Sequence, residues 1–146
     1  MMLDYNSLLL ALGVSTACLA VTLMGGWLVR RAETVLLTAT VGLVFVVSGI
    51  FVYSAYVDRP EIGFGIANFV LFHAGFATIW GAGRQFLTGR LPLPGIAIRA
   101  LAAMTFSIVP LLAGYDGLAF ISDNLAIALL LFATCLLYTS PSPRDS

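Results

Sequence analysis

The sequence contains few charged residues and few of the side chains that build metal or thiol sites. Charged residues make up 10% of the 146 residues, and there are two cysteines and one histidine. Two cysteines and one histidine are too few for a disulfide framework or a thiol–metal motif. No CxxC, HExxH, GxxxxGK[ST] or GxSxG pattern occurs, and no basic stretch is interleaved with aromatic residues. The sequence therefore predicts no catalytic residue, no metal, no other cofactor and no nucleic-acid partner.

Apolar residues are abundant instead, at 60% of the chain. They form five long blocks, and the charged residues are confined to the gaps between them. A helix needs about 20 apolar residues to cross the roughly 30 Å hydrocarbon core of a bilayer. A soluble domain of this length has too little interior to bury so many apolar side chains. We therefore predict an all-α integral membrane protein, a bundle of five transmembrane helices whose partner is the lipid bilayer. The predicted helices cover residues 7–29, 35–57, 63–82, 96–115 and 118–138.

The charges in the gaps give the bundle a direction. Before the C-terminal tail, five arginines fall at one end of the predicted bundle and a single one, Arg59, falls at the other. Cytoplasmic loops are the arginine-rich ones. We therefore predict a bacterial inner-membrane protein whose N-terminus lies outside and whose fifth helix ends in the cytoplasm. The topology-determining residues are Arg30, Arg31, Arg84, Arg90 and Arg99.

The C-terminal residues 135–146 differ in composition from the rest of the chain. They read CLLYTSPSPRDS and resemble one reading frame of a transposase sequencing adapter. We therefore predict that this tail is not native, that residues 1–134 form the membrane bundle, and that the natural protein continues beyond Thr134. The alternative is a native disordered tail rich in serine and proline.

A few polar residues interrupt the apolar blocks. By its place in the third block, His73 is predicted to be the only ionisable side chain well inside a span. Asn68 lies on the same helix but on another face. Asp123 and Asn124 are expected near the outer interface. An ionisable residue inside a membrane is costly and often functional, yet a neutral histidine can also bond to a neighbouring helix. These four residues are candidates for sensing or for contact between helices, and both roles stay open.

Four segments carry a resemblance to a known family. They read MMLDYNSLLLALGVSTACLAVTL at the N-terminus, GLVFVVSGIFVYSAYV at residues 42–57, GxxRQFxTGRLP at residues 81–92, and LLAGYDGLAFISDNLAIALLLFAT at residues 111–134. Together they resemble the N-terminal multi-pass membrane region of alphaproteobacterial GGDEF-type diguanylate cyclases. The resemblance covers essentially all of residues 1–134.

The resemblance implies a sensory and anchoring region that regulates a missing C-terminal cytoplasmic domain, which condenses GTP into cyclic di-GMP. It also implies a homodimer, in which helix packing controls the pairing of two cyclase domains. This sequence contains no GGDEF or GGEEF signature. The chain itself is therefore expected not to be an enzyme, whereas its parent protein is expected to be a diguanylate cyclase. The alternative belongs to another class, a small multi-pass permease or membrane-assembly protein that acts through the bundle itself.

Overall fold

The structure is a computed structural model that describes residues 4–139. Within that range the chain forms five α-helices and no strand, so the predicted all-α fold with five helices is confirmed. Residues 140–146, which belong to the predicted non-native tail, lie outside the described residues. The helices are α1 (Tyr5–Val29), α2 (Thr34–Asp58), α3 (Ile62–Thr88), α4 (Leu93–Leu112) and α5 (Asp116–Thr139).

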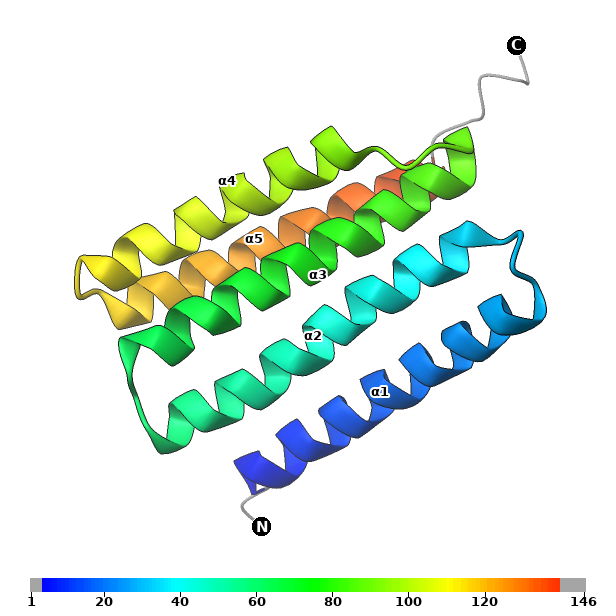
Figure 1. The fold of residues 1–146 in the computed structure, drawn as a ribbon. Helices are drawn as coiled ribbons and strands as arrows, with labels where there is room; N and C mark the ends of the chain where they lie inside the picture. Colours follow the sequence, from blue (N-terminus) through cyan, green and yellow to red (C-terminus); the bar gives the residue numbers. More distant parts are fainter. Residues whose placement is uncertain (1–3, 140–146) are drawn as a thin grey trace.

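Consecutive helices run in opposite directions because the connections between them are short. The α1–α2 and α3–α4 connections lie at the same end of the bundle as the C-terminal end of α5 (Figure 1). The α2–α3 and α4–α5 connections lie at the opposite end, together with the start of α1 (Figure 1). The arginine-rich segments therefore share one end of the bundle.

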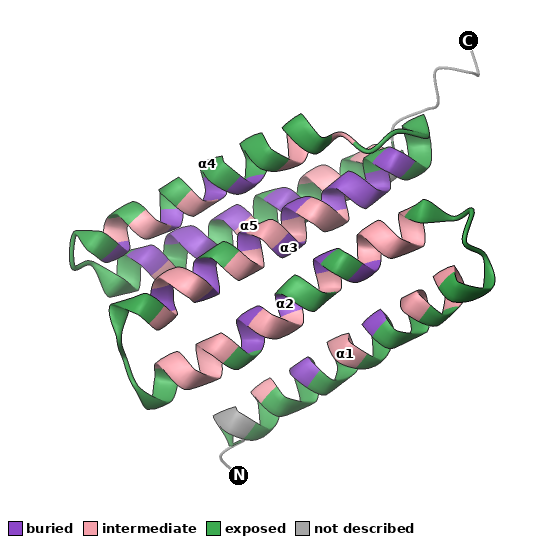
Figure 2. Cartoon of the chain, viewed as in Figure 1, coloured by how far each residue is buried: buried purple, intermediate pink, exposed green. Residues whose placement is uncertain are grey.

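The outer surface of the bundle is apolar. Val21 is 72% exposed, Ile121 66% and Phe106 52%. Exposed residues follow α1 and α4, whereas buried residues concentrate along α3 (Figure 2). Each of the five helices is long and apolar enough to cross a membrane. An apolar surface of this extent is favourable in lipid and unfavourable in water. The fold is therefore that of a multi-pass membrane protein.

Helix α3 is the centre of the bundle. It packs against α2, α4 and α5, whereas α1 packs against α2 alone. The contact between α2 and α3 is close because glycines meet there. A Cβ atom added to Gly75 would lie 2.8 Å from the carbonyl oxygen of Gly42, and one added to Gly42 would lie 3.0 Å from the carbonyl oxygen of Gly75. Small residues allow two helix backbones to approach in this way.

The helix boundaries differ most from the predicted ones around the α3–α4 connection. Helix α3 is predicted to end at residue 82 but continues to Thr88. Gly89 ends it with a φ of 71° and donates its N–H to the carbonyl of Gln85. Helix α4 begins at Leu93, upstream of the predicted start at residue 96, and Pro94 lies in its first turn. Proline is tolerated there because the N–H groups of a first turn have no helical partner.

Candidate functional site

Helix α3 carries three buried polar side chains, at two levels along the helix. Asn68 and His73 lie in the first half of the helix, and Gln85 lies in its last turn. His73 is fully buried, and Asn68 is only 1% exposed. Buried polar groups in a membrane bundle must find partners on neighbouring helices, because lipid offers none.

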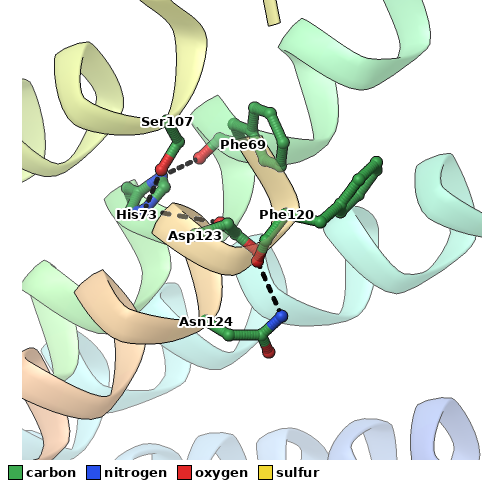
Figure 3. A network of polar contacts seen from close by, with 6 residues as sticks. All are labelled: Phe69, His73, Ser107, Phe120, Asp123 and Asn124. Atoms are coloured by element: carbon green, nitrogen blue, oxygen red, sulfur yellow. Dashed lines mark hydrogen bonds and ion pairs between the residues drawn. The ribbon is translucent and has the colours of Figure 1, made fainter. Parts of the chain in front are cut away.

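The imidazole of His73 joins three helices. Its Nδ1 atom lies 2.7 Å from the carbonyl oxygen of Phe69, one turn earlier in α3. Its Nε2 atom lies 3.4 Å from the hydroxyl oxygen of Ser107 on α4 and 3.4 Å from Oδ1 of Asp123 on α5. Figure 3 shows the imidazole between these two side chains. The site therefore lies where α3, α4 and α5 meet.

The partners of the ring determine where its protons lie. A carbonyl oxygen only accepts hydrogen bonds, so Nδ1 carries a proton and donates it to Phe69. In a neutral ring, Nε2 then has a lone pair and accepts from the hydroxyl of Ser107. An ionised Asp123 beside that lone pair would be an unpaired buried charge, which is strongly unfavourable. Protonation of the Asp123 carboxyl group removes this cost. The His73–Asp123 pair is therefore neutral as a whole.

Small residues on α4 and α5 bring the partners of His73 into reach. On α4, the buried face repeats at three- and four-residue spacing through Ala100, Ala103, Ser107 and Leu111. On α5, Asp123 lies between Ala119 and Ala126, which are both buried. Alanine side chains leave room for the helices to approach. Ser107 and Asp123 consequently point inward, and both are buried.

The predicted surroundings of His73 need a correction. Asp123 was expected near the outer interface, with His73 as the only ionisable side chain well inside a span. Helix α5 begins at Asp116, so Asp123 lies about two turns, roughly 10 Å, along the helix. Its carboxylate is buried against His73. His73 therefore shares its site with a second ionisable group, on the helix face that the neighbouring alanines mark as internal.

The other two candidate residues lie apart from the imidazole. Asn68 is buried, and its Oδ1 atom has no hydrogen-bond partner among the described residues. Asn124 follows Asp123 but is exposed, and its Nδ2 atom donates to the carbonyl oxygen of Phe120 at 2.8 Å (Figure 3). The structure thus brings together His73 and Asp123 from the predicted set. It adds Ser107, which the sequence analysis missed because a single serine in an apolar block gives no signal of its own.

A second polar cluster joins the ends of α2 and α3. The Nε2 atom of Gln85 donates to the hydroxyl oxygen of Thr34 at 2.9 Å, and its Oε1 atom accepts from the hydroxyl of Thr38 at 2.7 Å. The sequence analysis missed this cluster because the predicted third helix ended at residue 82, which left Gln85 in a connection. The spacing of Thr34 and Thr38 by one helical turn is the signal that would have found it.

The topology-determining arginines are all exposed at one end of the bundle, with Arg30, Arg31, Arg84 and Arg90 at or beside the connections. Arg99 lies further along, in the second turn of α4. Its guanidinium group lies 3.7 Å from the centre of the Trp80 ring and donates to the carbonyl oxygen of Gly95. The side chain reaches back along α4 toward the arginine-rich end, as snorkelling predicts.

The described residues include no group of three or more histidine, cysteine, aspartate and glutamate side chains that could hold a metal ion. Comparison with known proteins gives no match, since no family model, no curated protein and no solved structure is similar to this chain.

Proposed function

We propose that this chain is the membrane sensory and anchoring region of a diguanylate cyclase, and that it regulates a cytoplasmic domain which synthesises cyclic di-GMP. The observation that carries the proposal is the buried His73–Asp123 pair, which connects the central helix α3 to α5. Ionisable residues in a membrane bundle are costly and so point to a function. The cyclase domain that would receive the signal is inferred from the family resemblance across residues 1–134.

The regulatory step is a shift between two packings of α5 against α3. Helix α5 is the last helix of the described chain, and it ends at the arginine-rich end of the bundle. A stimulus that separates Asp123 from His73 favours a packing in which the end of α5 has moved. That movement changes how two cyclase domains pair across a homodimer. A ligand or condition can drive this step only by stabilising one packing more than the other.

The proposal places the N-terminus outside the bacterial inner membrane and the arginine-rich end in the cytoplasm. Alkaline phosphatase fused after Pro60 or Asp116 should be active, because it reaches the periplasm. The same reporter fused after Arg31 or Gly89 should be inactive, because arginine-rich connections stay inside. The opposite pattern at both pairs of sites would reverse the topology. The end of α5 would then lie outside the cytoplasm, away from the proposed cyclase domain.

The decisive test reads the source gene through the Thr134 junction and measures cyclic di-GMP in cells that express the whole gene. We expect a GGDEF-encoding frame downstream. We also expect His73→Gln and Asp123→Asn to change the cyclic di-GMP level at unchanged protein abundance. Thr105→Val is the matched control, since this exposed hydroxyl on α4 donates to the carbonyl of Leu101 within its own helix. A natural stop codon with no cyclase domain would favour the permease or membrane-assembly alternative.

The isolated 146-residue chain should neither consume GTP nor form cyclic di-GMP, because its sequence has no phosphate-binding loop. Product formed by the purified chain would contradict the division into a sensory region and a separate catalytic domain.

A further inference from the structure

A groove of about 440 Å³ lies between α4 and α5. Its lining consists of four alanines, two leucines, Phe106 and Arg99. It follows α4 from Arg99 to Phe106 and α5 from Ala126 to Ala133, which is about two helical turns, roughly 10 Å, on each helix. Because the two helices run in opposite directions, Ala133 lies at the same end of the groove as Arg99. That end faces the arginine-rich end of the bundle.

The groove opens on the outer surface of the bundle, where lipid surrounds the protein. Leu129 is 59% exposed and Phe106 is 52% exposed. The apolar part of the groove therefore accepts an acyl chain from the bilayer. An acyl chain gains little by this transfer, because the groove and the bilayer are equally apolar. A preferred occupant must consequently be selected by Arg99, the one charged side chain of the lining.

The guanidinium group of Arg99 is held in place without an acidic partner. Among the described residues, no carboxylate lies within ion-pair distance of it. Its Cζ atom lies 3.7 Å from the centre of the Trp80 ring, and Nη1 donates to the carbonyl oxygen of Gly95 at 3.2 Å. The hydrogen bond uses one of the five N–H donors of the group. The remaining donors form a planar fork that fits two oxygen atoms of a phosphate group.

We propose that this groove binds an anionic phospholipid, whose phosphate group accepts hydrogen bonds from Arg99 and whose acyl chain lies between α4 and α5. The headgroup is anionic because the lining carries one positive charge and no negative one. A zwitterionic lipid brings its own ammonium group close to the phosphate, and that group repels the guanidinium. Basic pockets between membrane-spanning helices are suited to anionic headgroups. This binding goes beyond the proposed regulation of a cyclase and does not depend on it.

A second copy of the chain is the competing occupant of the groove, and Arg99 disfavours it. Copies in one membrane share one orientation, so a symmetric pair presents the same surface on both sides of its interface. Two groove faces in contact would bring two copies of Arg99 to the same depth beside an apolar interface. Like charges held together without a counterion are unfavourable. A lipid phosphate supplies the counterion instead.

The test measures quenching of Trp80 fluorescence by phospholipids that carry bromine on the acyl chain near the headgroup. The full chain carries Trp27→Phe, which leaves Trp80 beside Arg99 as its single tryptophan, and is reconstituted in phosphatidylcholine vesicles. Half-maximal quenching should need about fivefold less brominated phosphatidylglycerol than brominated phosphatidylcholine. A fivefold preference is the effect of about one favourable charge contact at a membrane surface.

Further substitutions in this chain separate the headgroup contact from the acyl-chain contact. Arg99→Gln should remove the preference, so that the two lipids quench equally. Arg90→Gln is the matched control and should keep it, since Arg90 is exposed at the same end of the bundle but does not line the groove. Ala102→Phe fills the groove at an exposed position and should weaken quenching by phosphatidylglycerol. Ala97→Phe, at an exposed position of α4 outside the groove, should not.

Three results would overturn the assignment. They are equal quenching of the Trp27→Phe chain by the two lipids, an equal preference in Arg99→Gln and Arg90→Gln, and undiminished quenching in a folded Ala102→Phe variant. A second copy in the groove would give the first result. The comparison of lipids uses one chain, so it does not depend on how the further variants fold. Quenching is measured without GTP or a cyclase domain. A failed cyclase proposal therefore leaves this result intact, and failed lipid selection leaves the cyclase proposal standing.

Discussion

The two polar clusters on α3 differ in how completely their hydrogen bonds are made. In the Gln85 cluster, both ends of the amide have a hydroxyl partner on α2, at 2.9 and 2.7 Å. In the His73 cluster, the contacts that cross between helices are 3.4 Å long. Among the described residues, Oδ1 of Asp123 there has no hydrogen-bond partner, nor does Oδ1 of Asn68, which lies apart from the imidazole. One cluster is closed, and the other retains unused acceptors.

This difference separates a structural contact from a site that can respond. A closed cluster holds two helices in one arrangement, because any movement breaks hydrogen bonds that lipid cannot replace. An open cluster contains groups that gain partners when a ligand enters or when helices shift. The closed cluster joins α2 to α3, whereas the open cluster joins α3 to α4 and α5. We therefore expect α2 and α3 to move as a unit, and α5 to be the helix that responds.

The largest effect should come from removing one member of the His73–Asp123 pair. His73→Leu leaves the carboxyl group of Asp123 buried without its polar neighbour on α3. We expect the free energy of unfolding to fall by about 2–3 kcal/mol, the upper part of the range for a buried polar group left without its partner. Asp123→Leu should cost less, because a neutral His73 keeps its bonds to Phe69 and Ser107. The measurement is reversible unfolding of the purified chain in mixed detergent micelles.

The double variant His73→Leu/Asp123→Leu is the control for this pair. It removes both polar groups, so it should recover most of the stability that His73→Leu loses. Additive losses in the double variant would show that the two side chains do not interact. The open cluster would then be two independent contacts.

The fold could be predicted from the sequence because it depends on block length. Five apolar blocks separated by charged gaps are enough to predict five helices, since a membrane allows few other structures. The arrangement of these helices could not be predicted in the same way. The close contact at Gly42 and Gly75 depends on which helices are neighbours, and the glycines alone do not identify the partner. The orientation in the membrane stays a prediction from the arginines.

The candidate site could be predicted only in part, for a related reason. His73 stood out as an ionisable residue in the middle of an apolar block. Its partners Ser107 and Asp123 lie on other helices, so their proximity depends on tertiary packing. Asp123 was expected near the outer interface because only a few residues separate it from the connection before the fifth helix. The buried alanines on the same face of α5 are the feature that indicates its inward direction.

A smaller effect should follow from opening the closed cluster. Gln85→Leu removes the two hydrogen bonds that join α3 to Thr34 and Thr38. We expect a loss of about 1–2 kcal/mol in the free energy of unfolding, because interhelical hydrogen bonds in membranes contribute modestly. Thr105→Val should change stability by less than about 0.5 kcal/mol, as an exposed substitution away from both clusters. The same detergent unfolding assay measures both. A Gln85→Leu variant as stable as Thr105→Val would remove the distinction between the closed and open clusters.

The smallest effect is expected at Asn68, and its sign is opposite. Oδ1 of Asn68 is buried and has no hydrogen-bond partner among the described residues, so folding carries the cost of desolvating it. Leucine has a similar size and has no polar group to desolvate. Asn68→Leu should therefore raise the free energy of unfolding by about 1 kcal/mol, the lower part of the range for an unsatisfied buried group. Gln85→Leu loses stability under the same conditions because its amide is satisfied. If Asn68→Leu destabilised the chain as much as Gln85→Leu, the amide of Asn68 would have hydrogen-bond partners in the folded bundle.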